Sequence, residues 1–375
     1  MSSVRFEQSD AQRLVQERSR SSLFHPLVDF FALGGLSLIA LGGFALWGPK
    51  TEIAFWTTVA AMVAHVVNHP HFAASYQIFY ARFGAKLRSA EYGHGLRMRY
   101  LFAGLIVPVL LLAFFIWCFI TRDAQTLGFG VNAMFFLVGW HYVKQGYGVL
   151  MVYAALRKVR IPVLTRQVLL ANAYACWGYA WLNANRAVYE SEYWGVPWGA
   201  FALPEPYFMV LAGTAATLTL TASLLLIYDY YRDCAAPLNG LVGYACAIYP
   251  WTVVPHLHPA MALLIPAFHS LQYLIIVARF RINYGAGTST GRAALPARLR
   301  GAVGFFVVSA ALGYLGFWGL PEALSAVTAW DAAFGDGSRA LFFCAWIFIN
   351  VHHYFLDNVM WRRENPDIRR HLLKA

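Results

Sequence analysis

The chain has 375 residues, of which 59% are hydrophobic and only 13% are charged, and its mean hydropathy is +0.50. Soluble domains carry about 25% charged residues, so this composition excludes an ordinary soluble domain and indicates an integral membrane protein. The formal charge of +11 does not indicate a nucleic-acid partner, because the basic residues stand at the ends of apolar runs rather than on one polar face.

The apolar runs follow a charged leading segment, residues 1–26, in which no cleavable signal peptide is visible. A helix needs about 20 apolar residues to cross a bilayer. The sequence therefore predicts an all-α, polytopic transmembrane bundle of about ten spans, forming one domain over residues 27–361, with a basic tail over 362–375. In chain order, the expected spans cover residues 27–48, 53–80, 100–120, 128–156, 165–183, 206–228, 239–256, 259–281, 301–320 and 338–361.

Basic residues distinguish the two sides of the membrane. Lys and Arg cluster in the leading segment, in residues 82–99, 157–166 and 279–300, and in the tail, whereas most of the alternate loops are poor in both. Because cytoplasmic loops carry an excess of Lys and Arg, we expect the N- and C-termini to be cytoplasmic. The expected localisation is multi-pass insertion in a bacterial inner membrane.

The seventh and eighth spans differ from the others because prolines interrupt them. A proline inside a helix removes one backbone hydrogen bond and bends the helix. We therefore expect the region over residues 239–281 to be kinked, broken or partly re-entrant. The prolines concerned are Pro250, Pro255, Pro259 and Pro266.

Histidines are unusually frequent within the expected spans. Ionisable residues inside a membrane are costly, and a functional role is the default interpretation for them. The histidines that fall in or at the ends of spans are His65, His69, His71, His141, His256, His258, His269, His352 and His353.

Four spans carry a histidine at a similar depth. His69, His141, His269 and His352 precede the next arginine by 13, 16, 10 and 10 residues. These separations place the imidazoles roughly 15–24 Å inward along a helix. We therefore expect rings from four helices to meet between the middle of the bilayer and the cytoplasmic leaflet.

Spacing along the helices selects the expected ligands. His65 and His69 are four residues apart and share a helical face, while His352 and His353 are adjacent and point about 100° apart. Pro70 is expected to kink the second span. The metal ligands predicted on this basis are His65, His69, His141, His269, His352 and His353.

Other polar residues are expected to support these ligands from a second layer. Asp357 follows His353 by four residues and could ligate the metal or orient that ring. Gln145 and Gln272 follow a predicted ligand by four and three residues. His71 is expected to point away from the ligands, and His256 and His258 lie nearer the outer side, so all three are assigned to this layer.

The donor types indicate which metal the site would hold. Imidazole clusters suit iron, copper, zinc or nickel, and neither Cys nor Met accompanies these histidines. Chemistry on a lipophilic substrate in a bilayer usually requires activation of O2, which zinc does not perform. We therefore expect one or two iron ions, with copper and zinc ranked behind iron.

At "HVVNHPH", "HYVKQ", "FHSLQY" and "NVHHYFLD" the chain resembles the membrane histidine-box iron oxygenases, that is, desaturases, hydroxylases and alkane monooxygenases, and the membrane carotene-cleaving oxygenases. The resemblance is confined to the motif positions. The two HxxHH-type boxes of desaturases are absent, which leaves the iron count open. The resemblance implies a non-haem iron oxygenase that hydroxylates, desaturates or oxidatively cleaves a lipophilic substrate, using O2 and electrons from a cytosolic donor.

Two other functional classes remain open at this point. A haem protein would use axial pairs such as His141 with His269, or His69 with His352. A metal-ion or proton transporter would explain the interrupted seventh and eighth spans, although Asp357 is nearly the only carboxylate near the intramembrane histidines. A hydrolase is not indicated, since the sequence has no G-x-S-x-G or H-E-x-x-H motif.

Overall fold

The structure, a computed structural model, is almost entirely helical, which confirms the predicted all-α class. In the described part of the chain the only strands form a short antiparallel pair, β1 (Glu192–Tyr193) with β2 (Val196–Pro197). The described residues are 22–47, 53–186, 192–201, 203–233, 235–257, 264–285, 294–335 and 337–372.

The first half of the chain forms long helical segments joined by short ones. Its helices are, in order, α2 (Pro26–Phe30), η1 (Phe31–Gly35), α3 (Leu36–Trp47), α4 (Ile53–Val63), η3 (Ala64–Asn68), α5 (His69–Tyr80), α6 (Phe83–Arg88), η4 (Ala90–Tyr92), α7 (His94–Leu101), η5 (Phe102–Ile106), α8 (Val107–Thr121), α9 (Ala124–Leu156) and α10 (Val163–Arg186).

The second half continues in the same way after the strand pair. Its helices are α11 (Glu205–Asp233), α12 (Leu238–Leu257), α13 (Ile265–Tyr284), α14 (Ala294–Tyr314), η8 (Leu315–Gly319), α15 (Leu320–Val327), η9 (Asp331–Phe334), α16 (Ala340–Met360) and α17 (Pro366–His371). Every predicted span overlaps one of these helical segments.

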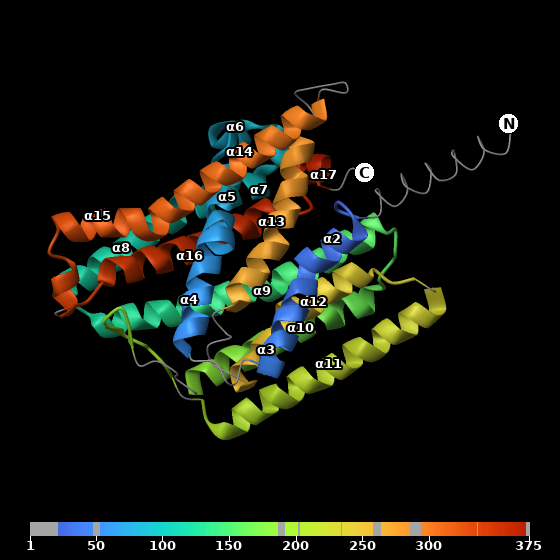
Figure 1. Cartoon of the computed structure of the whole chain (residues 1–375), viewed down its shortest axis with the longest axis horizontal. Coiled ribbons are helices and arrows are strands. Elements are labelled where there is room, and N and C mark those ends of the chain that lie inside the picture. The colour runs from blue at the N-terminus through green and yellow to red at the C-terminus, as the bar shows by residue number, and fades with distance from the viewer. Residues whose placement is uncertain are drawn as a thin grey trace.

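Within the described residues, five helical segments are long and apolar enough to cross a membrane, judged by length and composition. They differ in how much of their surface the rest of the protein covers. The most apolar 18-residue stretch of Ala340–Met360 is 67% buried inside the protein, whereas that of Glu205–Asp233 is 11% buried. Figure 1 shows the same contrast, with α11 along one edge of the bundle and α16 among other helices. The other three segments are Pro26–Leu46, His94–Thr121 and Leu295–Val327.

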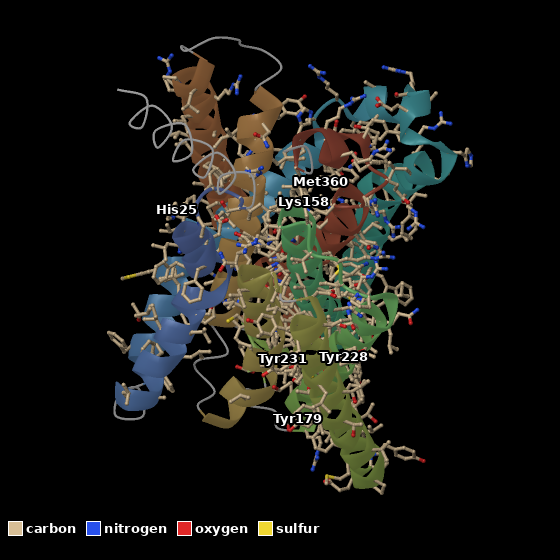
Figure 2. The ribbon with its side chains drawn as sticks, turned by 90° about the vertical axis from the view of Figure 1, so that its right-hand side faces the viewer. His25, Lys158, Tyr179, Tyr228, Tyr231 and Met360 are labelled. Atoms are coloured by element: carbon tan, nitrogen blue, oxygen red, sulfur yellow. The ribbon has the colours of Figure 1, made fainter. Side chains whose placement is uncertain are left out.

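Several helix ends gather on one side of the bundle. Figure 2 looks from the right-hand side of Figure 1 and labels His25 before α2, Lys158 after α9, Tyr231 near the end of α11 and Met360 at the end of α16. On this side α2 begins, whereas α9, α11 and α16 end. α2 therefore runs in the opposite direction to α9, α11 and α16.

π-helical turns directly precede three of the prolines. The turns η3, η5 and η8 end two residues before Pro70, Pro108 and Pro321. Proline has no N–H, and its ring collides with the carbonyl four residues earlier in a regular helix. A wider turn relieves that contact, and such turns are frequent at functional sites. At Pro70, where the sequence predicts a kink, the chain therefore contains a local π turn.

The interrupted region is described only in part. α12 continues through Pro250 and Pro255 to Leu257, and α13 begins at Ile265 with Pro266 in its first turn. The connection over 258–263, which includes Pro259, lies outside the described residues. The expectation of a re-entrant segment there stays a prediction.

Candidate metal centre

Four histidine side chains from four helices meet in the interior of the bundle. His71 of α5, His141 of α9, His269 of α13 and His353 of α16 each offer one ring nitrogen, and these nitrogens lie within 4.8 Å of one another. None of the four residues is more than 9% exposed. Four nitrogens bound at about 2.1 Å around one tetrahedral ion stand about 3.4 Å apart. Small ring movements would close this set on a single ion, so the four side chains could hold a metal.

The ring nitrogens of this cluster are mostly without hydrogen-bond partners. Nε2 of His71, Nε2 of His141 and both nitrogens of His269 and of His353 are buried and make no hydrogen bond, although the carboxylate of Asp357 lies 3.4 Å from Nε2 of both His141 and His353. Buried polar atoms are almost always hydrogen-bonded, and each exception requires a physical reason. A cation at the centre would give one nitrogen of each ring a shared partner, so the donor set fits a bound metal.

A second layer of contacts fixes the His71 ring. Ser270 Oγ lies 3.1 Å from His71 Nδ1 and 2.8 Å from Asn68 Oδ1. If the hydroxyl donates to Asn68, it accepts a hydrogen bond from Nδ1–H, which leaves the Nε2 lone pair of His71 free. A hydrogen bond to the second ring nitrogen is typical of metal-binding histidines, because it sets the tautomer and the ring orientation.

Asp357 lies against two of the four rings. Its Oδ2 is 3.4 Å from Nε2 of both His141 and His353. Its Oδ1 accepts a hydrogen bond of 3.1 Å from the Tyr273 hydroxyl, which in turn accepts one of 3.2 Å from Trp361 Nε1. The carboxylate is therefore held in place and can orient two rings or join the ligand set. The sequence predicts this role toward His353 alone.

Tyr142 and two glutamines surround His269 and its helix. The Tyr142 ring stacks on His269 with centroids 3.7 Å apart and planes 14° apart. Gln145 donates to the backbone carbonyl of His269 at 3.1 Å, and Gln272 donates to backbone carbonyls on η1 and α12, including that of Gly243 at 3.0 Å. The structure thus places both amides on main-chain groups instead of on the imidazoles, where the sequence analysis expects them.

His65 and His69 share a helical face, as their spacing implies, but that face is turned away from the cluster. Their centroids are 4.9 Å apart, and the rings stack on Trp318 at 5.6 Å and Phe317 at 4.4 Å respectively. His69 and His71 are two residues apart, about 200° around a helix. Only one of them can therefore face the centre, and it is His71.

His352 also points away from the cluster. Its Nδ1 lies 3.0 Å from the Tyr76 hydroxyl, and its Nε2 lies 3.0 Å from the Ala103 carbonyl oxygen. Adjacent helical residues diverge by about 100°, so His353 faces inward while His352 faces α5 and η5. Of the six expected ligands, the structure brings together His141, His269 and His353.

The sequence contains a pattern that indicates an inward-facing His71, but the four-residue spacing of His65 and His69 draws attention to the opposite face of the helix. Asn68, His71 and Ser75 follow one another at three and four residues, so they form a polar stripe on one face of the helix. In the structure this stripe meets Ser270 and Tyr273 of α13. A second-layer role for His256 and His258 is not tested, because the His256 side chain and all of His258 lie outside the described residues.

No protein-family model, no curated protein and no solved structure matches the chain. The resemblance to histidine-box oxygenases therefore stays a prediction, and the chemistry of the centre is argued from its geometry.

Proposed function

We propose that the chain is an integral-membrane oxidoreductase that holds one iron ion between His71, His141, His269 and His353 and oxygenates a lipophilic substrate. The observation that carries the proposal is the convergence of buried, unpartnered ring nitrogens from four helices. Leaving so many polar atoms buried without partners is costly unless a cation binds them.

The donor set supports iron as the occupant. Four neutral imidazoles and one nearby carboxylate suit iron, copper, nickel or zinc, and no cysteine thiol, the softer kind of donor, belongs to the cluster in the described part of the chain. When bound, a redox-active iron would supply activation of O2, with electrons from a cytosolic donor. Apolar substrates in a bilayer offer few polarised bonds to hydrolyse, which favours oxidative chemistry over hydrolysis.

The protein side chains would position the ligands and keep water away from the site. Asp357 orients His141 and His353, and Ser270 orients His71. The rings of Tyr142 and Phe72 cover the cluster, with Phe72 4.7 Å from His353 between centroids. A dry, rigid enclosure of this kind is what the protein contributes to cofactor chemistry.

We also propose that the chain crosses a bacterial inner membrane about ten times, with both termini in the cytoplasm. Five segments have the length and composition for it, and long helices such as α9 and α13 carry the buried polar groups of the centre, which lower their mean hydropathy. The placement of the basic loops supports this topology, as does the shared side on which α2 begins and α9, α11 and α16 end (Figure 2).

The geometry favours a non-haem site over a haem site. Ring centroids within the cluster are 4.4–5.1 Å apart for the contacting pairs, so imidazoles surround the centre from several sides. A porphyrin needs open space in the whole plane around its iron. His141 and His269 are one of the pairs that the sequence offers as axial haem ligands. The rings of His71 and His353 contact them in the space that a porphyrin would need, so this pair does not suit haem.

Elemental analysis of the detergent-purified protein, prepared from iron-replete cells, tests the proposal. We expect stoichiometric iron without a Soret band, lost in His269→Ala and retained in His65→Ala. Zinc or an absence of metal in the wild-type protein would contradict an iron enzyme, and a Soret band would contradict a non-haem site. Iron that exchanges rapidly with a chelator would contradict an enzyme and support a transporter.

A further inference from the structure

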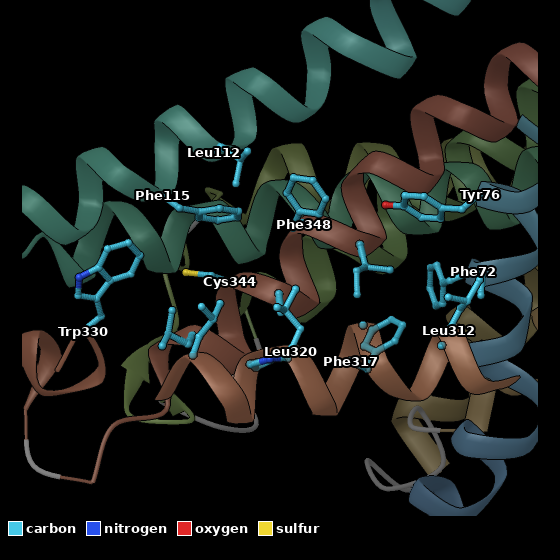
Figure 3. Close-up of a pocket in the computed structure, with 18 of the residues that line it drawn as sticks. Phe72, Tyr76, Leu112, Phe115, Leu312, Phe317, Leu320, Trp330, Cys344 and Phe348 are labelled. Atoms are coloured by element: carbon cyan, nitrogen blue, oxygen red, sulfur yellow. The ribbon is translucent and has the colours of Figure 1, made fainter. Parts of the chain in front are cut away.

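An apolar cavity lies beside the candidate centre, between helices that supply only two of its ligands. Its volume is about 570 Å³, and α5, α8, α16 and the continuous segment α14–η8–α15 line it. Figure 3 shows Trp330 at one end of the cavity and Phe72 with Tyr76 at the other. The cavity is therefore elongated along α16.

Phe72 forms the boundary between this cavity and the histidine cluster. Its side chain lines the cavity, and its ring centroid is 4.5 Å from that of His71 and 4.7 Å from that of His353. Phe317 packs against Phe72 at 5.2 Å and also lines the cavity. A ligand that reached this inner end would be separated from two of the four histidines by one aromatic ring.

The lining determines the chemical class of the occupant. Among the described residues that line the cavity, none is Lys, Arg, Asp or Glu. Its polar atoms include the hydroxyl of Tyr76, which bonds to His352, and the thiol of Cys344. A charged group would lose its hydration here without a compensating partner. The part of the ligand that enters the cavity must therefore be uncharged.

The length of the cavity matches a single extended chain. Lining residues on one wall run from Leu312 to Leu324. Twelve helical positions correspond to roughly 18 Å. A fully extended polypeptide advances about 3.5 Å for every three backbone bonds, and an extended hydrocarbon chain advances by a similar amount. A wall of this length therefore matches a hydrocarbon of roughly fifteen carbon–carbon bonds.

The end of the cavity at Trp330, opposite Phe72, is the end at which a hydrocarbon chain would enter. A second hollow shares Ile116, Phe119 and Trp330 with the cavity and continues to Arg122 at the end of α8. At the inner end, Phe72 and Phe317 block further passage. A chain that enters past Trp330 therefore arrives with its terminal carbons foremost.

We propose that this cavity is the substrate site and that it binds one uncharged hydrocarbon chain, alkyl or isoprenoid, end-on with its terminal carbons against Phe72. The reaction implied rests on the proposed function: a C–H bond near the chain terminus would be replaced by a C–OH bond that takes one oxygen atom of O2. The other oxygen atom would leave as water with two protons and two electrons, the electrons coming from the external donor. The binding itself does not, since the cavity walls require no metal.

Photolabelling in phospholipid nanodiscs tests the binding site. The probe is hexadecane with a diazirine on its terminal carbon, and labelled positions are identified by mass spectrometry. We expect labelling of the peptides that contain Phe72 and Phe317. In Ala345→Phe, where the new ring fills the cavity, labelling should fall by about tenfold or more, equivalent to about 1.4 kcal/mol of binding free energy.

Two further variants keep the test interpretable. Ala216→Phe adds the same ring to an exposed position of α11, distant from the cavity in sequence and fold, and labelling should not change. Gly316→Leu is a second filling variant for the case in which Ala345→Phe does not fold, because a Cβ at Gly316 would meet only the flexible end of Ile349, at 3.2 Å.

Three results would overturn the inference. Labelling unaffected by both filling variants would do so, as would labelling spread over the exposed face of α11. Equal labelling of Phe72 by a phospholipid with the diazirine at the end of its acyl chain would show that membrane lipid occupies the cavity. The metal content of the same preparation is measured alongside, so wild-type protein that lacks iron as purified but still binds the probe would refute the proposed function and leave the substrate site intact.

Discussion

The four-histidine cluster and the His65–His69 face carry the same side chains in two different settings. In the cluster, single histidines from four helices point at one another, and most of their ring nitrogens lack partners. On the other face, two histidines of one helix lie side by side, stacked on Trp318 and Phe317. Two histidines close in sequence therefore need not converge on one point, whereas histidines from several helices that enclose a common space can hold a metal ion.

The largest expected effect separates His353 from its neighbour His352. His353→Ala should lower metal affinity by more than about 100-fold, beyond the range for a group that only orients a ligand, since it removes a ring from the centre. His352→Ala should retain the metal but cost roughly 1–3 kcal/mol of unfolding free energy, because Tyr76 and the Ala103 carbonyl lose a partner. Metal content and thermal unfolding in detergent measure the two effects. Equal metal loss in both variants would show that the two settings are not distinct.

An intermediate effect is expected for Asp357, which orients rings of the cluster; within the described residues no carboxylate forms such an ion pair with His65 or His69. Asp357→Asn should weaken metal binding by about 10–100-fold, measured by competition with a chelator. Asp331→Asn is the matched control, because Asp331 accepts hydrogen bonds from Leu341 N at 2.8 Å and Ser325 Oγ at 2.5 Å, away from the cluster. Unchanged affinity in Asp357→Asn would remove the carboxylate from the centre.

The smallest expected effect concerns Lys86 of α6, whose Nζ donates to the carbonyls of Ile78 and Phe79 near the end of α5 at 2.8 and 2.9 Å. Burial lowers the pKa of Lys86 from 10.5 to about 8, and the Asp367 carboxylate opposes part of that shift. Between these two values the unfolded chain binds more protons than the folded chain, so the contribution of Lys86 to stability rises with pH.

The Lys86→Met variant should therefore lack this rise between pH 8 and 10.5, while its metal content stays that of the wild type. Thermal unfolding across the pH range, compared between the two proteins, measures the difference. A wild-type profile parallel to that of the variant would contradict the buried lysine, and a change in metal content would show that the end of α5 influences His71 at its start.

The helices were predictable from sequence because each apolar run has about 18 residues or more, close to the length of a span, and most runs end in charged or turn-forming residues. The direction in which each histidine ring points was not predictable, because it depends on which neighbouring helices pack against the helix that carries it. His69 and His71 are equally polar and two residues apart, and only the approach of α13 and α16 to one side of α5 selects His71. The π turn at 64–68 further disturbs the regular phase that spacing arguments assume.

The apolar cavity was not predictable for a related reason. Its walls come from four segments far apart in sequence, and residues such as Leu112, Leu312 and Ala345 resemble any other lipid-facing or core position. Nothing in their local pattern marks the space between them. The polar cluster has a signal in the sequence because buried imidazoles are unusual, whereas a hydrocarbon site is made of the commonest residues of a membrane protein.

The unpartnered nitrogens of the cluster also bear on how long the protein survives in a cell. If the proposed ion binds there, a newly inserted chain without it would keep these atoms dry and unpaired and would have a smaller free energy of unfolding than the loaded chain. Quality-control proteases act on chains that open, and they would remove the empty form faster. Metal supply during biogenesis would then set the abundance of this protein as well as its chemistry.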